Sequence, residues 1–444
     1  MEKNLTTGSV FRTIIQFSLP YLLSYFLQTL YGMADLFIIG QFAEVDSITA
    51  VSVGSQVMHM ITVVIVGLAM GTTVLVGRAI GAGRRKEASA VIGNTVTLFL
   101  GLSIMLTLLL LAVRKPLVAL MATPKEAVSG TVFYLTICFL GIPFITAYNI
   151  ISSVFRGLGD SKSPMYFVAL ACGANIALDY LFIGGLGLEA AGAALGTVLA
   201  QTFSVAVSLL MIRRRKAGLQ LSAADMRPRK ATMGSLFKIG VPVALQDGCI
   251  QVAFIVITVI ANKRGLNDAA AVGIVEKIIG ILFLVPSSML SAVSALSAQN
   301  IGAGKQERAK QTLWYATAIA VVFGMTVSVA VQFVAEPVVG LFSPDPGVIL
   351  PGGQYLRSYV WDCVFAGIHF CFSGYFCACG KSLLSFLHNI ASIICVRIPV
   401  AYFASVYYPD TLFPMGIASP AGSMLSALIC VAAYLWMERK GTNT

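Results

Sequence analysis

The same short segment occurs twice in this chain, about half a chain length apart. Ile80-Gly-Ala-Gly returns as Ile301-Gly-Ala-Gly, so that Gly81 in the first copy corresponds to Gly302 in the second. Other pairs keep nearly the same separation: Pro20 and Pro242, Tyr134 and Tyr355, and Gly159 and Gly380. The chain is therefore expected to fold as two homologous halves. In membrane proteins built from repeats, the ligand site lies at or near the boundary between the halves.

The composition indicates a polytopic membrane protein. Hydrophobic residues make up 57% of the chain and charged residues 11%, whereas soluble domains carry about 25% charged residues. Apolar runs of about 20 residues are long enough to cross a bilayer. Twelve such runs cover residues 14–40, 48–77, 89–112, 127–150, 164–185, 190–212, 235–261, 270–297, 312–334, 354–378, 382–406 and 415–437.

We therefore predict an all-α polytopic membrane protein with twelve transmembrane helices in two homologous six-helix bundles. The predicted parts are an N-terminal six-helix lobe (1–212), a basic cytoplasmic linker (213–234) and a C-terminal six-helix lobe (235–444). The first run is longer than a signal-peptide core and no Ala-x-Ala cleavage site precedes it, so we expect it to be retained as a helix.

The distribution of basic residues predicts the orientation in the membrane. Of the 30 Lys and Arg residues, 22 fall on one side of the predicted spans and six on the other. By the positive-inside bias, both termini are expected to be cytoplasmic, with the chain in a bacterial cytoplasmic membrane. The net charge of +11 and the basic runs at 213–216 and 227–230 are explained by this orientation and by anionic lipid headgroups. Nucleic acid is not an expected partner.

The nine cysteines all lie within or at the ends of hydrophobic runs, where small apolar packing is their expected role. Cys377 and Cys379 lack the two-residue spacing of common metal and redox pairs, and no histidine cluster accompanies them. We expect no bound cofactor.

Five acidic residues lie inside predicted spans, and they carry most of the functional information. They are Asp35, Asp179, Asp247, Glu276 and Asp362. A charged residue at mid-helix costs about 2.5 to 3.5 kcal/mol on an insertion scale, so each acid should face the bundle interior, be neutralised or be functional.

The first predicted helix carries a polar stripe. Tyr21, Ser24, Gln28, Tyr31 and Asp35 follow spacings of three and four residues, which places them on one helix face. Lipid tails would offer these polar side chains neither hydrogen bonds nor hydration, whereas a water-filled cavity would hydrate them. Pro20, just before the stripe, removes a backbone hydrogen bond and can bend the helix.

A second polar group is predicted at the same depth. Asn175 and Asp179 share one face of the fifth helix, and the short turn at 184–189 makes the fifth and sixth helices neighbours. Thr197 lies on the sixth helix at the level of Asp35 and Asp179. Two carboxylates with an amide and a hydroxyl could hold a dehydrated sodium ion or share a proton. The alternative is a polar cluster that only pins helices together.

The remaining polar residues in the spans give weaker signals. Asp247, with Gln246 beside it, is a candidate for lining the cavity. Glu276 and Lys277 are explained by a local ion pair or an interfacial position. Asp362 and His369 share a face that we expect to reach only the outer vestibule. His59 is interpreted as an interior, hydrogen-bonded histidine. Arg397 is expected to pair with an acid or to extend to the interface, and the sequence does not choose its partner.

Taken together, these features resemble the multidrug and toxic compound extrusion (MATE) family over essentially the whole chain. The matching segments are the duplicated Ile-Gly-Ala-Gly loop, Tyr31-Gly-Met-Ala-Asp35-Leu-Phe-Ile-Ile-Gly40 after Pro20, Phe155-Arg-Gly-Leu-Gly-Asp160, and Asn175-Ile-Ala-Leu-Asp179. The resemblance implies two six-helix lobes around a central cavity. It also implies an antiporter that exports drug-like cations by alternating access in exchange for protons or sodium ions.

The resemblance also implies where the site lies. In the DinF-like branch, which the chain resembles, the cation site is in the N-terminal lobe. The matching positions are Asp35, Asn175, Asp179 and Thr197, with Asp35 and Asp179 as sodium ligands if sodium is the coupling ion. Neighbouring cavity positions match Gln28, Tyr31 and Asn149. The NorM-like branch uses acids of the C-terminal lobe, whereas the corresponding positions here are Ile250 and Gly367.

Other functional classes fit the sequence less well. The chain lacks the Gly-rich loop with a Lys-Ser/Thr ending of an ATPase and any Gly-x-Ser-x-Gly motif, so we expect no enzyme activity. The rival hypothesis is a flippase or exporter of a lipid-linked or polysaccharide precursor. Such a cavity should present several arginines, but Arg397 is nearly alone in the spans. A channel or receptor would not need the duplicated acid-bearing scaffold. We expect a functional monomer with small, cationic amphipathic substrates and lipid neighbours.

Overall fold

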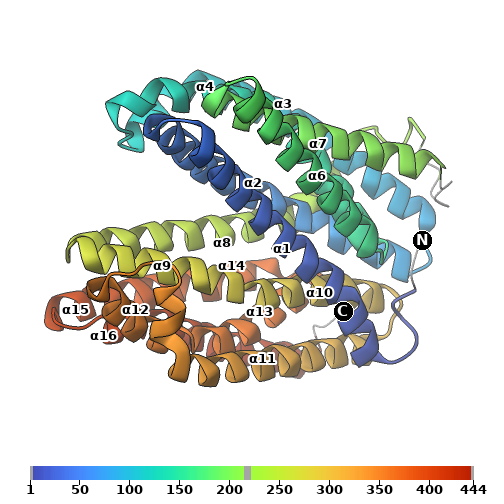
Figure 1. The fold of residues 1–444 in the computed structure, drawn as a ribbon. Coiled ribbons are helices and arrows are strands. Elements are labelled where there is room, and N and C mark those ends of the chain that lie inside the picture. The colour runs from blue at the N-terminus through green and yellow to red at the C-terminus, as the bar shows by residue number, and fades with distance from the viewer. Residues whose placement is uncertain (1–3, 215–221, 442–444) are drawn as a thin grey trace. The chain divides into compact units, whose positions relative to one another are not determined.

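The computed structural model describes residues 4–214 and 222–441, and throughout these residues the regular structure is helical, without strands. Figure 1 traces the elements along the chain. The first half contains α1 (Val10–Phe42), α2 (Val45–Gly81), α3 (Arg85–Leu120), η1 (Lys125–Ala127), α4 (Val128–Leu140), α5 (Ile142–Gly157), α6 (Lys162–Asp179), η2 (Tyr180–Gly185) and α7 (Glu189–Arg214).

The second half repeats this order with more interruptions. It contains α8 (Lys230–Asn262), α9 (Leu266–Leu282), α10 (Leu284–Gly302), α11 (Gln306–Gly340), α12 (Pro346–Tyr359), α13 (Asp362–Ala378), α14 (Ser382–Ser392), η3 (Ile393–Arg397), α15 (Ile398–Tyr407), α16 (Phe413–Gly416) and α17 (Ala418–Arg439).

The predicted fold class is confirmed. Within the described residues, ten helical segments are long and apolar enough to cross a membrane, and the number rises to twelve when two bent helix pairs each count as one span. These pairs are α4 with α5, bent by 50°, and α12 with α13, bent by 41°. The breaks follow Leu140 and Tyr359, which are corresponding places in the two halves. Pro143 at the start of α5 cannot donate a backbone hydrogen bond, which favours the first break.

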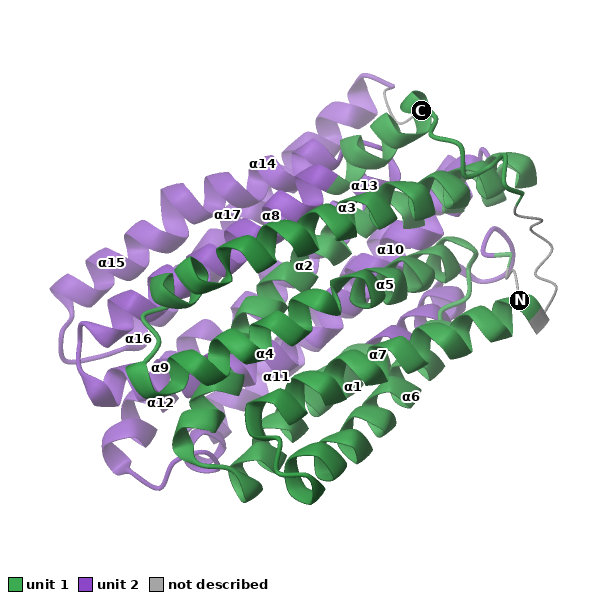
Figure 2. Cartoon of the chain, turned by 90° about the horizontal axis from the view of Figure 1, so that it is seen from above, with its two compact units in different colours: residues 1–4, 23–240 green, residues 5–22, 241–444 purple. Residues whose placement is uncertain are grey.

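The chain forms two compact units whose borders fall inside helices. Unit 1 comprises residues 1–4 and 23–240, and unit 2 comprises residues 5–22 and 241–444 (Figure 2). One border lies in α1, close to Pro20, and the other lies in α8, next to Pro242. A proline inside a helix removes one backbone hydrogen bond and weakens the helix there. The lobe borders predicted at 212 and 235 from the duplication remain a prediction.

Unit 1 is held together by close contacts at small residues. The helices α2, α4, α5 and α7 surround an apolar core that includes Val51, Tyr134 and Leu135. A methyl group added at Gly54 would strike the Tyr134 ring, and one added at Gly157 would strike α2. Such small residues let membrane helices approach closely, where dispersion and packing provide the attraction.

Unit 2 is arranged around α13, which packs against α10, α11 and α17. Trp314, Phe372 and Tyr434 form an edge-to-face aromatic cluster with ring centroids 5.7 to 5.8 Å apart. At Gly374 the backbone of α13 meets the carbonyl of Leu290 on α10, leaving no room for a side chain. These contacts fix α13 as the central helix of the unit.

In unit 2, an N-terminal segment is bound at the α10–α11 connection. Arg308 donates hydrogen bonds to the carbonyls of Thr7 (2.8 Å) and Gly8 (2.7 Å), and Leu5 is 1% exposed. Lys310 pairs with Glu438 at 2.9 Å. The N-terminal segment, the α10–α11 connection and the end of α17 therefore lie at one end of unit 2.

In unit 1, the end of the linker is bound to α3. The Asn94 side chain donates to the carbonyl of Asp225 (3.1 Å) and accepts from the backbone N–H of Arg229 (2.7 Å). Thr97 donates to the carbonyl of Met226 at 2.7 Å. The linker therefore follows a defined path over α3 before α8 begins.

Candidate functional site

Three helices of unit 1 carry the predicted cation site. Asp35 is on α1, Asn175 and Asp179 are on α6, and Thr197 is on α7. The helices α6 and α7 are joined by the π-helical turn η2 and pack side by side (Figure 1). A π-helical turn is rare and frequently marks a functional position. Here the turn begins directly after Asp179.

The structure brings the four predicted side chains together. Thr197 Oγ1 donates to Asp35 Oδ2 at 3.5 Å, and Asp35 lies beside Asn175 and Asp179. Asp35 is 5% exposed and Asp179 is fully buried. Gly196, which the sequence did not single out, makes this arrangement possible, because a methyl group at its position would overlap Asp179 Oδ1.

Most polar atoms of this cluster lack a hydrogen-bond partner among the described residues. They are Asp35 Oδ1, both carboxylate oxygens of Asp179, and the amide oxygen and nitrogen of Asn175. None of the ion pairs found in the described residues involves Asp35 or Asp179. Two adjacent buried carboxylates without a basic partner require a neutralising cation, either a proton that they share or a metal ion.

The side chains at this site also limit how many ligand atoms a metal ion could bind. The described residues contain no group of three or more His, Cys, Asp or Glu side chains placed to hold a metal. A sodium ion would therefore depend on the oxygens of Asn175 and Thr197 in addition to the two carboxylates. Hard cations accept such neutral oxygen ligands.

The predicted cavity residues Gln28 and Tyr31 have neighbours that the sequence did not reveal. Gln28 lies beside Tyr148 on α5, and Tyr31 lies beside Gln201 on α7. Gln201 follows Thr197 by four residues, so the helical period of α7 could have identified it. Asn149 is buried and donates to the carbonyl of its own helix at Ile145 (2.8 Å).

Asp247 belongs to a different compact unit from the other candidates. It lies on α8 in unit 2, partly buried and close to Cys377 of α13. The proposal that it lines the substrate cavity remains a prediction.

Two interpretations of weaker signals need correction. His59 is exposed in the structure, so it is not an interior histidine. Asp362 and His369 are buried, with 0% and 5% exposure, so they are not at an outer vestibule. Arg397 does pair with an acid, and the structure identifies Asp362 as its partner, with NH2 and Oδ2 2.9 Å apart.

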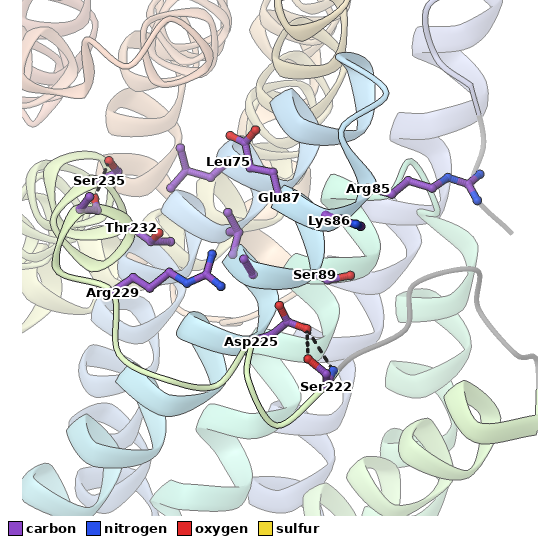
Figure 3. Close-up of a pocket in the computed structure, with 13 residues that line it drawn as sticks. Leu75, Arg85, Lys86, Glu87, Ser89, Ser222, Asp225, Arg229, Thr232 and Ser235 are labelled. Carbon is purple, nitrogen blue, oxygen red and sulfur yellow. Dashed lines mark hydrogen bonds between the residues drawn. The ribbon is translucent and has the colours of Figure 1, made fainter.

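A separate cavity of about 880 Å³ lies at the linker end of unit 1 (Figure 3). Arg85, Lys86 and Arg229 border it together with Glu87 and Asp225. The acids are already engaged: Glu87 pairs with Arg84 at 2.8 Å, and hydrogen bonds from the Ser222 backbone and hydroxyl hold the pKa of Asp225 below its ordinary value. The cavity is a basic, solvated surface and contains none of the predicted site residues.

Comparison with known proteins agrees with this fold. The sequence profile of the MatE family matches residues 20–181 and, a second time, residues 242–403. The chain therefore belongs to the MatE family of membrane transporters. The second match begins and ends at one constant offset from the first, which confirms the duplication.

The relatives cover nearly the full chain. A probable multidrug resistance protein, YoeA of Bacillus subtilis (strain 168), is 26% identical over 97% of this chain and 95% of its own length. An FAD transporter of Shewanella oneidensis MR-1 is 27% identical over 96% and 94%. A solved structure of a MOP superfamily transporter from Pyrococcus furiosus has the same fold, with a TM-score of 0.91 at 23% identity, covering 98% of this chain and 97% of that one.

Proposed function

We propose that this protein is a secondary active antiporter that exports organic cations in exchange for protons or sodium ions. The observation that carries the proposal is the buried pair of carboxylates, Asp35 and Asp179, which has no basic partner among the described residues. Such a pair needs a cation to be neutral and can release it when the site meets water at a different proton or sodium concentration. Relatives named as multidrug resistance proteins support small-molecule export.

The pair gives a simple basis for exchange. When the site is loaded with the coupling ion, Asp35 and Asp179 are neutralised, and a cationic substrate loses its electrostatic attraction. When the ion leaves, negative charge returns and attracts the substrate. Gln28, Tyr31, Tyr148 and Gln201 add polar and aromatic surface beside the pair. The coupling ion and the cationic substrate therefore compete for the negative charge of the carboxylate pair. This competition, repeated at each face of the membrane, couples their transport.

We further propose that the protein lies in the cytoplasmic membrane with both termini on the cytoplasmic side. The contacts at Arg308 and Lys310 place the N-terminal segment and the end of α17 at the same end of unit 2. Arg264, at the α8–α9 connection, donates to carbonyls of Tyr408 and Pro409 between α15 and α16 at the other end. The excess of basic residues on the first side then sets the direction by the positive-inside bias.

Export of ethidium from inverted membrane vesicles, under proton and sodium gradients imposed separately, tests this proposal. We expect one gradient to drive ethidium transport and Asp35→Asn to reduce it to background, because an amide cannot change its charge during the cycle. Asp410→Asn, at an exposed loop position, is the matched control. Wild-type export by well-expressed Asp35→Asn would refute the coupling role. Transport of FAD or of an anionic lipid-linked sugar without any response to ethidium would replace the cation substrate with those of the FAD transporter relative or of a flippase.

A further inference from the structure

The cavity at the linker end of unit 1 lies beside the first turns of two helices (Figure 3). Arg85, Lys86 and Ser89 border it from α3, while Thr232 and Ser235 border it from α8. The start of a helix offers unpaired N–H groups to an anion, and the N-cap residue of α3 makes no side-chain hydrogen bond to them. Cations, hydroxyls and helix termini thus surround one space of about 880 Å³.

The lining of this cavity favours an anionic ligand. Among the described residues, three cations line it against two acids, Glu87 and Asp225. Lys86 and Arg229 take part in none of the ion pairs found in the described part of the chain. Arg229 lies beside Asp225, but Asp225 Oδ2 already accepts hydrogen bonds from the backbone (3.0 Å) and the hydroxyl (2.8 Å) of Ser222. An anion in the cavity therefore meets a net positive charge.

A narrower apolar crevice follows the cavity along the same three helices. It is lined by Leu68 of α2, Leu98, Phe99 and Leu102 of α3, and Leu236 and Phe237 of α8. Leu68 lies about two turns from Leu75 of the cavity, and Leu98 about two turns from Val91, in both cases deeper in the predicted spans. A polar, basic mouth with an apolar crevice behind it matches a phospholipid, whose charged headgroup continues into an acyl chain.

The second half of the chain uses the equivalent place differently. The Ile-Gly-Ala-Gly repeat pairs Arg84 with Lys305 and Glu87 with Arg308. In unit 2, Lys305 and Arg308 bind carbonyls of the N-terminal segment. In unit 1, an acid replaces the arginine, and the linker is bound instead at Asn94, about two turns further along α3. The space beside the start of α3 is therefore left for a ligand from outside the described chain.

We propose that this cavity binds the headgroup of an anionic phospholipid from the leaflet at the linker end of unit 1, which the proposed orientation makes the cytoplasmic leaflet. Lys86 and Arg229 bind the phosphate oxygens, and hydroxyls such as that of Thr232 donate to them. One acyl chain lies along the crevice at Phe237, which is 39% exposed. A soluble phosphate ester shares the headgroup chemistry but has no group to place in the crevice.

Native mass spectrometry of the purified protein in detergent, with phosphatidylglycerol added at limiting concentration, tests the proposal. The wild type should retain one phosphatidylglycerol in preference to phosphatidylcholine. Each Lys or Arg beside an anionic lipid changes the affinity about fivefold, so Lys86→Ala/Arg229→Ala should bind phosphatidylglycerol about 30-fold more weakly. The control Lys162→Ala/Arg213→Ala removes the same charge at exposed positions outside the cavity and should bind like the wild type. Equal retention of both lipids by the wild type, or an equal loss in both double variants, overturns the proposal.

Two further measurements separate a lipid from a soluble ligand. Glycerol 3-phosphate in tenfold excess should not displace phosphatidylglycerol, and Phe237→Ala should weaken phosphatidylglycerol binding. Displacement at equal concentration would assign the cavity to a soluble phosphate ester and overturn the lipid proposal, as would unchanged binding by Phe237→Ala.

The melting temperature of the purified proteins gives a readout that also shows whether each variant is folded. Phosphatidylglycerol should raise the melting temperature of the wild type and of the control, and leave that of Lys86→Ala/Arg229→Ala unchanged. An equal rise in all three proteins contradicts the proposal. None of these measurements requires transport, so their failure would leave the proposed antiport standing, and a failure of ethidium export would leave the lipid site standing.

Discussion

Gly196→Ala is the sharpest test of the Asp35 site, because it adds one methyl group and removes no charge. The added Cβ would overlap Asp179 Oδ1, whereas ordinary Cβ contacts lie at 3.4 to 4 Å. Asp179 or α7 must therefore move by roughly 1 Å. A misplacement of about 1 Å in a functional constellation can cost about 100-fold in rate, which corresponds to about 2.7 kcal/mol.

The assay is the initial rate of ethidium export in inverted vesicles, together with the melting temperature of the purified protein. We expect an export rate about 100-fold below that of the wild type. The loss of stability should be modest, because overpacking typically costs about 1 to 3 kcal/mol and alanine regains roughly 0.5 to 1 kcal/mol of helix preference over glycine.

Gly173→Ala is the matched control, since it lies on α6 two residues before Asn175 and its added methyl group would meet no atom within 4 Å. It should export like the wild type and be slightly more stable. If Gly196→Ala exports at more than half the wild-type rate, or if Gly173→Ala loses as much activity, the close approach at Asp179 is not what the site requires.

Three further predictions follow from the contacts described above. The double variant Asp35→Asn/Asp179→Asn should be no worse in vesicle export than either single variant, because strongly coupled carboxyls titrate as one site; additive losses would indicate two independent sites. Cysteines introduced at 84–87 and in the 213–230 linker, in a background without native cysteines, should be protected from an impermeant reagent in intact cells, while those at 44–46 should react; external labelling of the linker would invert the topology. Arg308→Ala should expose the segment around Leu5 to protease and lower the melting temperature by a few degrees, because three carbonyls lose charged donors; unchanged protease resistance would show that the segment is held by other contacts.

The convergence of Asp35, Asn175, Asp179 and Thr197 was predictable from the sequence because local rules determine it. The helical period fixes the face of each side chain, the depth from the end of each span fixes its level, and the short turn before Glu189 makes α6 and α7 neighbours. The length of the apolar runs similarly predicted the twelve spans. The family resemblance pointed to the same four residues.

The Asp362–Arg397 ion pair of unit 2 was not predictable in the same way. Arg397 and Asp362 lie 35 residues apart on separate helices, and their contact depends on how α13 and η3 pack. No helical period or turn length determines that packing. His59 was interpreted as an interior histidine from its place in an apolar run, whereas the packing of α2 leaves this position exposed. Gly196 is important because its missing side chain leaves room for the Asp179 carboxylate, and a sequence pattern does not show how closely two helices approach.

The borders of the two units inside α1 and α8 have a consequence for biosynthesis. Residues 5–22 leave the ribosome well before residue 241, where the rest of unit 2 starts. At about 5 to 20 residues per second, the first part of α1 exists for roughly 10 to 40 s before synthesis of the rest of its unit begins. During that interval this part of α1 must be held by lipid or by the insertion machinery. Unit 1 likewise lacks its last segment until residues 230–240, the beginning of α8, have been synthesised.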